Sequence, residues 1–252
     1  MEIYDLDYNK RDLLISSLSL NLEDNIKVIE EYYKNFKIEK DRFLVISDTH
    51  FGRSKCDIYL MDKIYNYAIN NNIDTIIHAG DLVEGKSNPY MKNLSIDEQI
   101  KNFIKYYPND LVKTYYLYGN HDFNCYYYDK VDFKEYLKEL KNLEYIGVKN
   151  SYIYLNDNSI IKVEHECKTC NYLVPKLEYD FKIYGHKHSY GAYSEASDIR
   201  LPALILDNPD NIETGFLDVT LDLGNLIVNF YNNDINHIKE DVVCKRKVLK
   251  CE

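Results

Sequence analysis

The sequence lacks any long apolar run. None of its hydrophobic stretches approaches the roughly 20 residues that a membrane-spanning helix needs, so we expect no membrane partner. The first residues are acidic and also lack the pattern of a secretory signal peptide, which predicts a cytoplasmic protein. Without an export signal, the six cysteines are expected to be reduced thiols rather than disulfides.

Positive charge is also scarce. The formal net charge is −10 at pH 7, whereas nucleic-acid-binding proteins usually carry a basic surface. One short basic cluster, residues 244–250, lies near the end of the chain, and clusters of this size are commonly solvated tails. The charge balance therefore disfavours nucleic acid as a partner without excluding it, because bound metal ions or a local basic patch can override it.

The chain has no internal repeat, low-complexity segment or long linker, so we expect one domain within its 252 residues. Residues 23–36 have apolar side chains at helical spacing and predict an amphipathic helix in an N-terminal extension, residues 1–40. The domain core is predicted over residues 41–232, followed by a C-terminal tail at 233–252. The helix leaves a homo-oligomer open, although such apolar stripes more often pack on the core of their own chain.

Strand-like and helix-like patterns alternate in the first half of the core. Strands are expected at 43–47, 74–80 and 112–119, and helices at 57–71, 95–107 and 132–142. Ser95 opens the second of these helices, and Glu98 stands at the capping-box position.

Beyond residue 143 the pattern changes to successive strands. They are expected at 143–148, 151–157, 158–165, 181–185, 203–208, 214–222 and 226–232. The junction Leu223-Gly224-Asn225 is interpreted as a hairpin between the last two. This combination predicts an α/β fold in which two sheets pack face to face as a β-sandwich flanked by helices.

The predicted strands repeatedly end in polar residues of the same kinds. Asp48 and His50 follow the first strand, and residues i and i+2 of an extended chain lie on the same side. Ligands bind beyond the carboxyl ends of strands in open α/β sheets. Five or six of the seven histidines stand at such ends, which scattered structural histidines would not do. The other members of this group are His78, Asp81, Asn120, His121, Asp122, His165, His186 and His188.

These residue types suit divalent metal ions. Neutral imidazole, carboxylate and amide oxygen together are ligands for Mn²⁺, Fe, Co, Ni or Zn²⁺. The group holds more ligands than one ion needs, and a carboxylate has two oxygens with which to bridge a pair of ions. We therefore expect two divalent ions, with Mn²⁺ as the first choice and Fe, Ni, Co or Zn as alternatives. A pair of ions suits a phosphate ester, which it can clamp.

Five motifs in order resemble those of the calcineurin-like metallophosphoesterase superfamily. They are Asp48-Thr49-His50, Gly80-Asp81-Leu82-Val83-Glu84, Gly119-Asn120-His121-Asp122, His165 and Gly185-His186-Lys187-His188. The resemblance spans residues 48–188 and implies the αββα metallophosphoesterase fold, a two-sheet sandwich with helices outside. The sequence departs from the family at Glu166, where much of the family has glycine after the histidine.

The resemblance also implies a role for each residue. One ion would be held by Asp48, His50 and His188, the other by Asn120, His165 and His186, and Asp81 would bridge them. A metal-bridging hydroxide would attack phosphorus in line, so no separate strong base is required. His121 would donate a proton to the leaving oxygen or steady charge on phosphorus, and Asp122 would orient His121. For His78, a role in supporting the ligands and an ordinary core position both stay open.

Two further patterns have less support. Residues 80–87 match the P-loop expression, but the two carboxylates within them argue against a cradle for anionic phosphates. Cys167 and Cys170 would form a structural zinc site only with a second pair, Cys244 and Cys251, whose spacing is wide. Reduced, unpaired thiols are the favoured interpretation of these cysteines.

The expected activity is hydrolysis of a phosphate ester by two metal ions. The motifs from Asp81 to His165 follow one another at intervals of about forty residues, which leaves no room for a large cap domain. We favour a phosphodiesterase or phosphatase acting on a small or nucleotide-like substrate. The alternatives are a nuclease of the same superfamily and a non-catalytic interaction scaffold with the same fold. Degenerate members tend to lose the third-motif histidine, so the presence of His121 favours an enzyme.

Overall fold

The structure is a computed structural model that describes most of the predicted core. The described residues are 36–53, 56–85, 94–108, 112–148, 150–165, 178–193, 197–205, 213–238 and 241–247. Of the helix predicted at 23–36, only Phe36 is among them, and it belongs to a strand. Cys167, Cys170 and Cys251 lie outside the described residues. Within the described part of the chain, no helix has the length and apolar character needed to cross a membrane.

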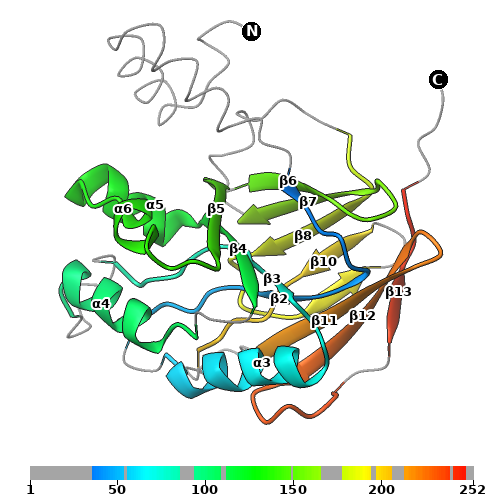
Figure 1. Ribbon diagram of the computed structural model, residues 1–252, viewed down its shortest axis with the longest axis horizontal. Helices are drawn as coiled ribbons and strands as arrows, with labels where there is room; N and C mark the ends of the chain where they lie inside the picture. Colours follow the sequence, from blue (N-terminus) through cyan, green and yellow to red (C-terminus); the bar gives the residue numbers. More distant parts are fainter. Residues whose placement is uncertain are drawn as a thin grey trace, which may run out of the picture.

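The first half alternates strands and helices, as predicted (Figure 1). The strands are β2 Arg42–Ile46, β3 Thr75–His78, β4 Lys113–Tyr118 and β5 Leu143–Val148, and the helices are α3 Ile58–Asn70, α4 Ile96–Tyr106, α5 Asn120–Asp129 and α6 Phe133–Leu137. The predicted capping box of α4 is confirmed. The Glu98 N–H donates to the Ser95 hydroxyl at 3.3 Å, and the Ser95 N–H donates to the Glu98 carboxylate at 2.8 Å.

Two helices differ from the prediction. Helix α5 was not expected, because its first turn is polar and shows no apolar stripe. It forms where Asp122, its third residue, accepts a hydrogen bond from the Gly119 N–H at 3.0 Å and so caps the helix. Helix α6 is shorter than the predicted helix at 132–142. It ends at Leu137, whose carbonyl accepts from the Leu140 N–H at 2.9 Å in a tighter turn.

The second half consists of strands. They are β6 Asn150–Tyr154, β7 Ile160–His165, β8 Phe181–Gly185, β9 Gly191–Tyr193, β10 Asp198–Arg200, β11 Gly215–Asp222, β12 Asn225–Asn232 and β13 Val242–Cys244. The predicted hairpin is confirmed, because Asp222 pairs with Asn225 across a turn of two residues that both have positive φ. The strand predicted at 203–208 is wrong in its described part. Ala203 and Ile205 form single bridges to different partners, so no ladder develops.

The strands form two sheets. The seven-stranded sheet has the order β13-β12-β11-β2-β3-β4-β5, and the six-stranded sheet has the order β1-β6-β7-β8-β10-β9, where β1 is Phe36–Lys37. Both sheets extend past the predicted core of 41–232. Strand β1 pairs with β6, and β13 pairs with β12 and buries Cys244. The ends of the domain are therefore set by strand pairing that short sequence patterns do not reveal.

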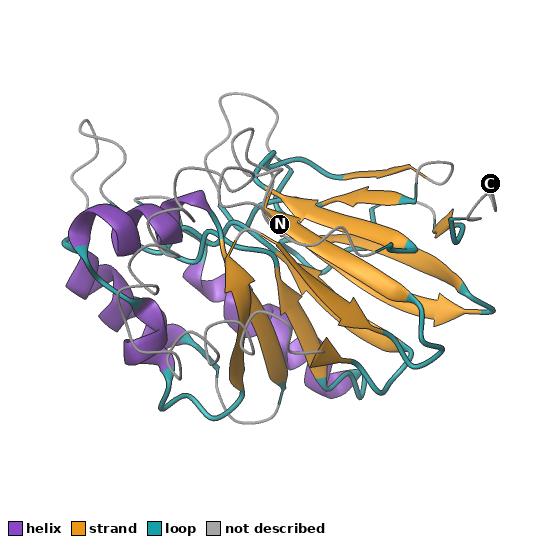
Figure 2. Ribbon diagram, turned by 90° about the horizontal axis from the view of Figure 1, so that it is seen from above, coloured by secondary structure: helices purple, strands orange, loops and turns teal. Residues whose placement is uncertain are grey.

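The layers follow from how the strands alternate their side chains. Phe43 and Val45 of β2 face the six-stranded sheet in the core between the sheets. Leu44 and Ile46 face the opposite way, into a second core beneath the helices. A strand buried on both faces is a continuous apolar run, as residues 43–46 of β2 are. Figure 2 shows the described helices gathered on one side of the strands. The predicted two-sheet α/β sandwich is confirmed.

Parallel pairing brings the polar strand ends together. Strands β2, β3 and β4 are parallel neighbours, with Ile46 beside His78 and His78 beside Tyr116. In the other sheet β7 and β8 are parallel, and His165 pairs with Gly185. The carboxyl ends of parallel strands meet at one edge, so the residues that follow them share one region.

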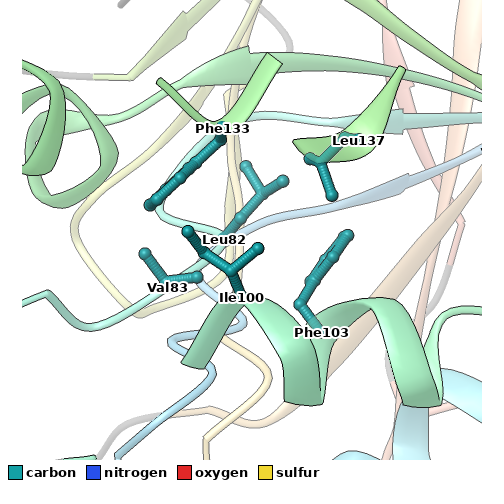
Figure 3. Close-up of a pocket in the computed structure, with 6 residues that line it drawn as sticks. All are labelled: Leu82, Val83, Ile100, Phe103, Phe133 and Leu137. Atoms are coloured by element: carbon teal, nitrogen blue, oxygen red, sulfur yellow. The ribbon is translucent and has the colours of Figure 1, made fainter. Parts of the chain in front are cut away.

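Apolar packing beneath the helices anchors the segment after β3. The side chains meet around a space too narrow for a water molecule (Figure 3). They are Leu82, Val83, Ile100, Phe103, Phe133 and Leu137. Leu82 and Val83 pack against side chains of helices α4 and α6. This packing holds in place the polar residues on either side of them in the chain, Asp81 and Glu84.

Candidate metal centre

The candidate ligands stand on an unusual backbone. Asp48, His50, Asp81, His186 and His188 all have positive φ, between 44° and 77°. Each such conformation costs a residue other than glycine on the order of 1 kcal/mol and persists only where the surroundings enforce it. Here the surroundings are cross-strand hydrogen bonds. The Asp48 N–H donates to the Gly80 carbonyl at 2.9 Å, and the His50 N–H donates to the Asp81 carbonyl at 3.1 Å.

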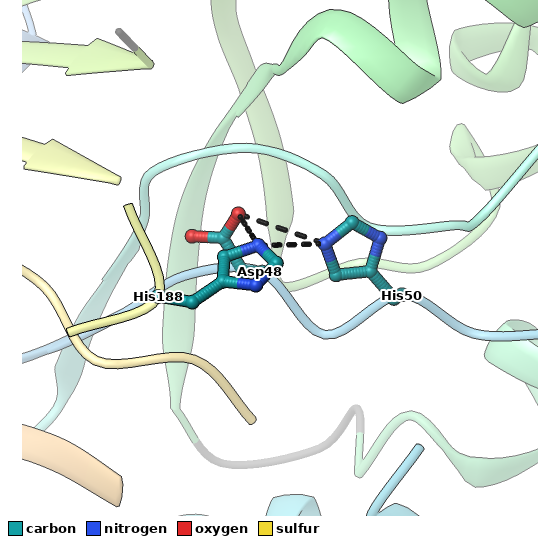
Figure 4. Close-up of side chains that lie close together, drawn as sticks. All are labelled: Asp48, His50 and His188. Carbon is teal, nitrogen blue, oxygen red and sulfur yellow. Dashed lines mark hydrogen bonds and ion pairs between the residues drawn. The ribbon is translucent and has the colours of Figure 1, made fainter. Parts of the chain in front are cut away.

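The first group of ligand atoms comes from Asp48, His50 and His188 (Figure 4). The His188 Nε2 lies 3.1 Å from the Asp48 Oδ1. The His50 Nε2 lies 3.2 Å from the His188 Nε2 and 3.6 Å from the same carboxylate oxygen. The three side chains therefore aim one atom each at a common point. Asp48 also accepts the His186 backbone N–H at 3.0 Å, which ties the β2 turn to the β8 turn.

The second group comes from Asp81, Asn120, His165 and His186. The His165 Nε2 lies 3.0 Å from the Asp81 Oδ2 and 3.1 Å from the Asn120 Oδ1. The His165 Nδ1 donates to the Ala79 carbonyl at 2.7 Å, so the Nε2 presents its lone pair to the group. A nitrogen of His186 lies within 4.8 Å of the Asp81 and His165 ligand atoms.

The two groups adjoin at Asp81. Its Oδ2 is 3.8 Å from the His50 Nε2 of the first group as well as 3.0 Å from the His165 Nε2 of the second. Ligand atoms about 2.0–2.2 Å from one ion at angles near 90–110° are roughly 3–3.5 Å apart. Separations of 3.0–3.2 Å in both groups match that spacing, and imidazole, carboxylate and amide oxygen suit borderline divalent ions. The residues present therefore fit a pair of divalent cations.

Charge compensation in the site is strong. Asp48 and Asp81 are almost fully buried. Burial raises the pKa of each carboxyl, but the charge of His165 and hydrogen bonds from neighbouring imidazoles outweigh it and hold both pKa values well below the ordinary range. For His50 and His165 burial acts in the opposite direction and lowers the pKa, because the charged form of an imidazole is the protonated one. The facing carboxylates outweigh it and raise these pKa values to about 10 and about 9. Cationic charge is thus what this site requires.

Glu84 was missed as a site residue by sequence reasoning. Its carboxylate Oε2 lies 2.9 Å from the His50 Nδ1, and its backbone carbonyl accepts a 2.6 Å hydrogen bond from the His121 Nδ1. The carbonyl contact places a proton on the His121 Nδ1, and the carboxylate pairs with the His50 Nδ1, so the Nε2 of each ring is left to face the site. Burial raises the pKa of Glu84, but the hydrogen bond and charge of His50 outweigh it, so the pKa is lowered. The sequence signal that could have identified Glu84 is its position as the last residue of the Gly-Asp-x-x-Glu motif.

The expected partnership of Asp122 with His121 is not what the structure shows. The Asp122 carboxylate accepts backbone N–H groups of Leu82, Val83 and Gly119 at 2.9–3.1 Å. As the third residue of α5 it reaches back to the helix start and caps it. Burial and the charge of Asp81 raise the pKa of Asp122 to about 6, against the lowering effect of these N–H groups. Asp122 fixes the loop, and the carbonyl of Glu84 orients His121.

The open question about His78 has a structural answer. His78 is buried, its Nδ1 accepts the Gly80 N–H at 3.2 Å, and its Nε2 lies 3.1 Å from the Thr49 hydroxyl. Burial lowers its pKa to about 4, so the ring is neutral and its Nε2–H donates to that hydroxyl. The Thr49 hydroxyl in turn donates to the Leu82 carbonyl at 3.0 Å. His78 therefore supports the turn that carries Asp48 and His50.

Comparisons with known proteins agree with this geometry. The model of the calcineurin-like phosphoesterase family matches residues 41–190. No curated protein matches the chain.

Solved structures share the fold. A dimetal phosphatase from Danio rerio is 9% identical, with a TM-score of 0.53 over 83% of this chain and 100% of that one. GAP50, the anchor in the inner membrane complex of Plasmodium, is 13% identical, with a TM-score of 0.51 over 83% of this chain and 90% of that one. An archaeal phosphodiesterase is 17% identical, with a TM-score of 0.46 over 80% of this chain and 99% of that one. At these identities the likeness to the first two structures shows the fold alone.

Replacing Glu84 by alanine is expected to weaken metal binding. The His50 Nδ1 would lose its carboxylate partner, and loss of such an outer contact typically costs about 10–100-fold in metal affinity. Calorimetric titration of metal-stripped protein with Mn²⁺ measures the change. The control is Glu135→Ala, which removes an exposed carboxylate paired only with Lys138 at the surface. Equal affinities in the two variants would contradict a role for Glu84.

Replacing Gly119 by alanine is expected to disrupt the centre without a change in charge. The added Cβ would collide with the Oδ1 and backbone nitrogen of Asp81, so the Asp81 carboxylate would have to move. The content of bound metal after dialysis, measured by elemental analysis, should fall well below that of the parent. The matched control is Gly191→Ala, where the nearest atom, the Tyr193 hydroxyl, is 3.1 Å away at the end of a side chain. Full metal content in Gly119→Ala would show that the Asp81 position is not critical.

Proposed function

This chain belongs to the calcineurin-like phosphoesterase family, and we propose that it hydrolyses phosphate esters with two divalent metal ions. The observation that carries the proposal is the convergence of candidate ligand groups on buried Asp48 and Asp81. Asp48, His50 and His188 form one group and Asp81, His165 and His186 another, and His121 lies near enough to His50 and Asp81 to make a third. Asp48, His50 and His188 would hold one ion, Asn120, His165 and His186 would hold the other, and Asp81 would contact both. Mn²⁺ is the expected ion, with Fe, Ni, Co or Zn as alternatives.

Bound ions of this kind neutralise phosphate charge and lower the pKa of a coordinated water, so that hydroxide is available near neutral pH. The protein supplies the placement. The Asp81 Oδ1 accepts the His121 backbone N–H at 2.8 Å, which sets this carboxylate against the positive N-terminal end of α5. The turns of β2, β3 and β4 therefore hold the ligand atoms ready, with little rearrangement left for the reaction.

We assign the proton donor role to His121. Its Nδ1 is occupied by the Glu84 carbonyl, and its Nε2 lies 4.0 Å from the Asp81 Oδ2, on the side of the ligand atoms. The His121 side chain is 21% exposed and that of His188 is 20% exposed, whereas His50 and His165 are buried. These two exposed rings mark the side from which substrate approaches. From there His121 can protonate a leaving oxygen.

The proposed substrate is a small or nucleotide-like phosphodiester or phosphomonoester. The short intervals between motifs and the exposed rings of His121 and His188 support an open site that accepts such molecules. The net charge of −10 disfavours long nucleic acids, so a nuclease activity ranks below a small-molecule activity. We further expect the protein to act in the cytoplasm.

A non-catalytic scaffold is the competing proposal, and one comparison favours it: GAP50, which shares the fold, is described as an anchor. Against it stands the complete set of ligand side chains together with His121 in this chain. Turnover decides between the two.

The test is hydrolysis of bis-p-nitrophenyl phosphate and p-nitrophenyl phosphate by metal-stripped protein, with Mn²⁺, Ni²⁺, Zn²⁺ and Mg²⁺ added separately. Turnover of the diester establishes a phosphodiesterase, and nucleotides and DNA are then the next substrates. Turnover of the monoester alone indicates a phosphatase. Protein that binds two ions and turns over neither compound with any metal would overturn the proposal in favour of a scaffold.

The variant His121→Ala is expected to keep its fold and metals and to lose activity. A positioned acid–base group contributes about 10²–10⁴-fold, so kcat should fall by that factor. Metal content and melting temperature should match the parent, because His121 is outside the assigned ligand set. His237→Ala is the control, since His237 is half-exposed and lies by Tyr231 and Asp241. Loss of metal in His121→Ala would show that the roles are divided wrongly.

A further inference from the structure

Helix α4 carries one buried polar residue on its apolar face. Ile96, Gln99, Ile100 and Phe103 are all buried, and Gln99 is 0% exposed. A buried amide is costly unless its groups are hydrogen-bonded. The Gln99 Oε1 accepts the Gly85 N–H at 2.8 Å, and its Nε2 donates to the Gly85 carbonyl at 3.2 Å and to the Leu94 carbonyl at 2.8 Å. The amide is thus satisfied by the loop after β3 and by the residue that precedes α4.

Gly85 is held from two sides. Its φ is +68°, and a Cβ there would lie 2.9 Å from the Cys125 Sγ of α5. From α4, the Gln99 side chain hydrogen-bonds both the N–H and the carbonyl of Gly85. The peptide that joins Glu84 to Gly85 has therefore little freedom to rotate, and the Glu84 carbonyl belongs to that peptide.

Gln99 also lies under the turn that carries His50. A Cβ on Gly52 would collide with the Cγ and Cδ of Gln99, so only glycine lets this turn pass over the amide. The Glu84 N–H donates to the Phe51 carbonyl at 3.0 Å and joins the two loops. One glutamine side chain therefore supports both segments whose contact fixes the His50 ring.

We propose that Gln99 is a positioning residue for the metal centre, a role that rests on the proposed function. The Gln99 amide hydrogen-bonds the backbone of Gly85, and this restrains the peptide that joins Gly85 to Glu84. The Glu84 carboxylate faces the His50 Nδ1, and its carbonyl accepts from the His121 Nδ1. Gln99 thereby sets the ring orientation of one metal ligand and of the proton donor without touching either. The same polar contacts would not be needed if the position served packing alone, because an apolar residue would complete the stripe.

The test uses Gln99→Met in the full-length protein, since methionine keeps the volume and removes all three hydrogen bonds. The first readout is imidazole N–H exchange with water in metal-free protein, followed by ¹⁵N NMR with the histidines assigned by substitution. The Nδ1–H protons of His50 and His121 should exchange about tenfold faster, the factor given by loss of roughly one hydrogen bond of protection. Affinity for Mn²⁺, by calorimetry, should fall about 10–100-fold.

The control is Ile64→Val, a conservative change in the same core cluster on α3. It trims the core without touching the loop, so both readouts should match the parent. Gln99→Glu is the second variant, because burial favours its protonated form, which keeps the acceptor for the Gly85 N–H and can donate one hydrogen bond in place of two. Its exchange rates should lie between those of the parent and Gln99→Met, and they stand as the test if Gln99→Met does not fold.

Parent-like exchange and metal affinity in Gln99→Met and Gln99→Glu would overturn the positioning role. So would losses no larger than those of Ile64→Val. Because exchange is measured without metal or substrate, it separates this inference from the proposed function. Faster exchange in a protein with no phosphoesterase activity would uphold the positioning role and refute the enzyme.

Discussion

The burial of two carboxylates is the constraint on which the rest of this structure depends. Asp48 and Asp81 are removed from water at adjacent strand ends, and an isolated charge there would be prohibitively costly. The surroundings therefore face them with the imidazoles of His50, His165 and His188, and with backbone N–H groups at the start of α5 and the β8 turn. A pair of divalent ions would extend the same compensation and would convert the cost of burial into affinity for metal.

Holding those charges in place requires an unfavourable backbone, and the fold provides the restraint. Five candidate ligands sit in the left-handed region, where only strong local constraints keep residues with side chains. The constraints are layered. Hydrogen bonds link the β2 and β3 turns, Asp122 ties backbone groups of Leu82 and Val83 to α5, and α4 and α6 pack beneath the same two residues. The helices on the seven-stranded sheet thus serve the site as much as the core.

Much of the framework was predictable from local pattern. Residues 43–46 of strand β2 are apolar because both faces of the strand are buried. The pair Ser95 and Glu98 indicates the start of α4. Predictions failed where tertiary contacts override local pattern. Helix α5 begins with polar residues whose partners are on another segment, residues 203–205 bridge two distant segments singly, and β1 and β13 add short strands beyond the expected core. Two or three residues that pair with a distant strand leave no periodicity to detect.

The sequence by itself determined the kinds and order of the functional side chains, because polar residues after apolar strands are visible in the chain. Five ordered motifs identified the family, and parallel pairing made their convergence foreseeable. Only the tertiary structure decided which atoms meet. In the structure the Asp122 carboxylate accepts hydrogen bonds from backbone N–H groups, and Glu84 contacts both His50 and His121. The structure also set Gln99 beneath the loop. These partnerships depend on backbone orientation and on contacts between segments distant in sequence, which no local pattern encodes.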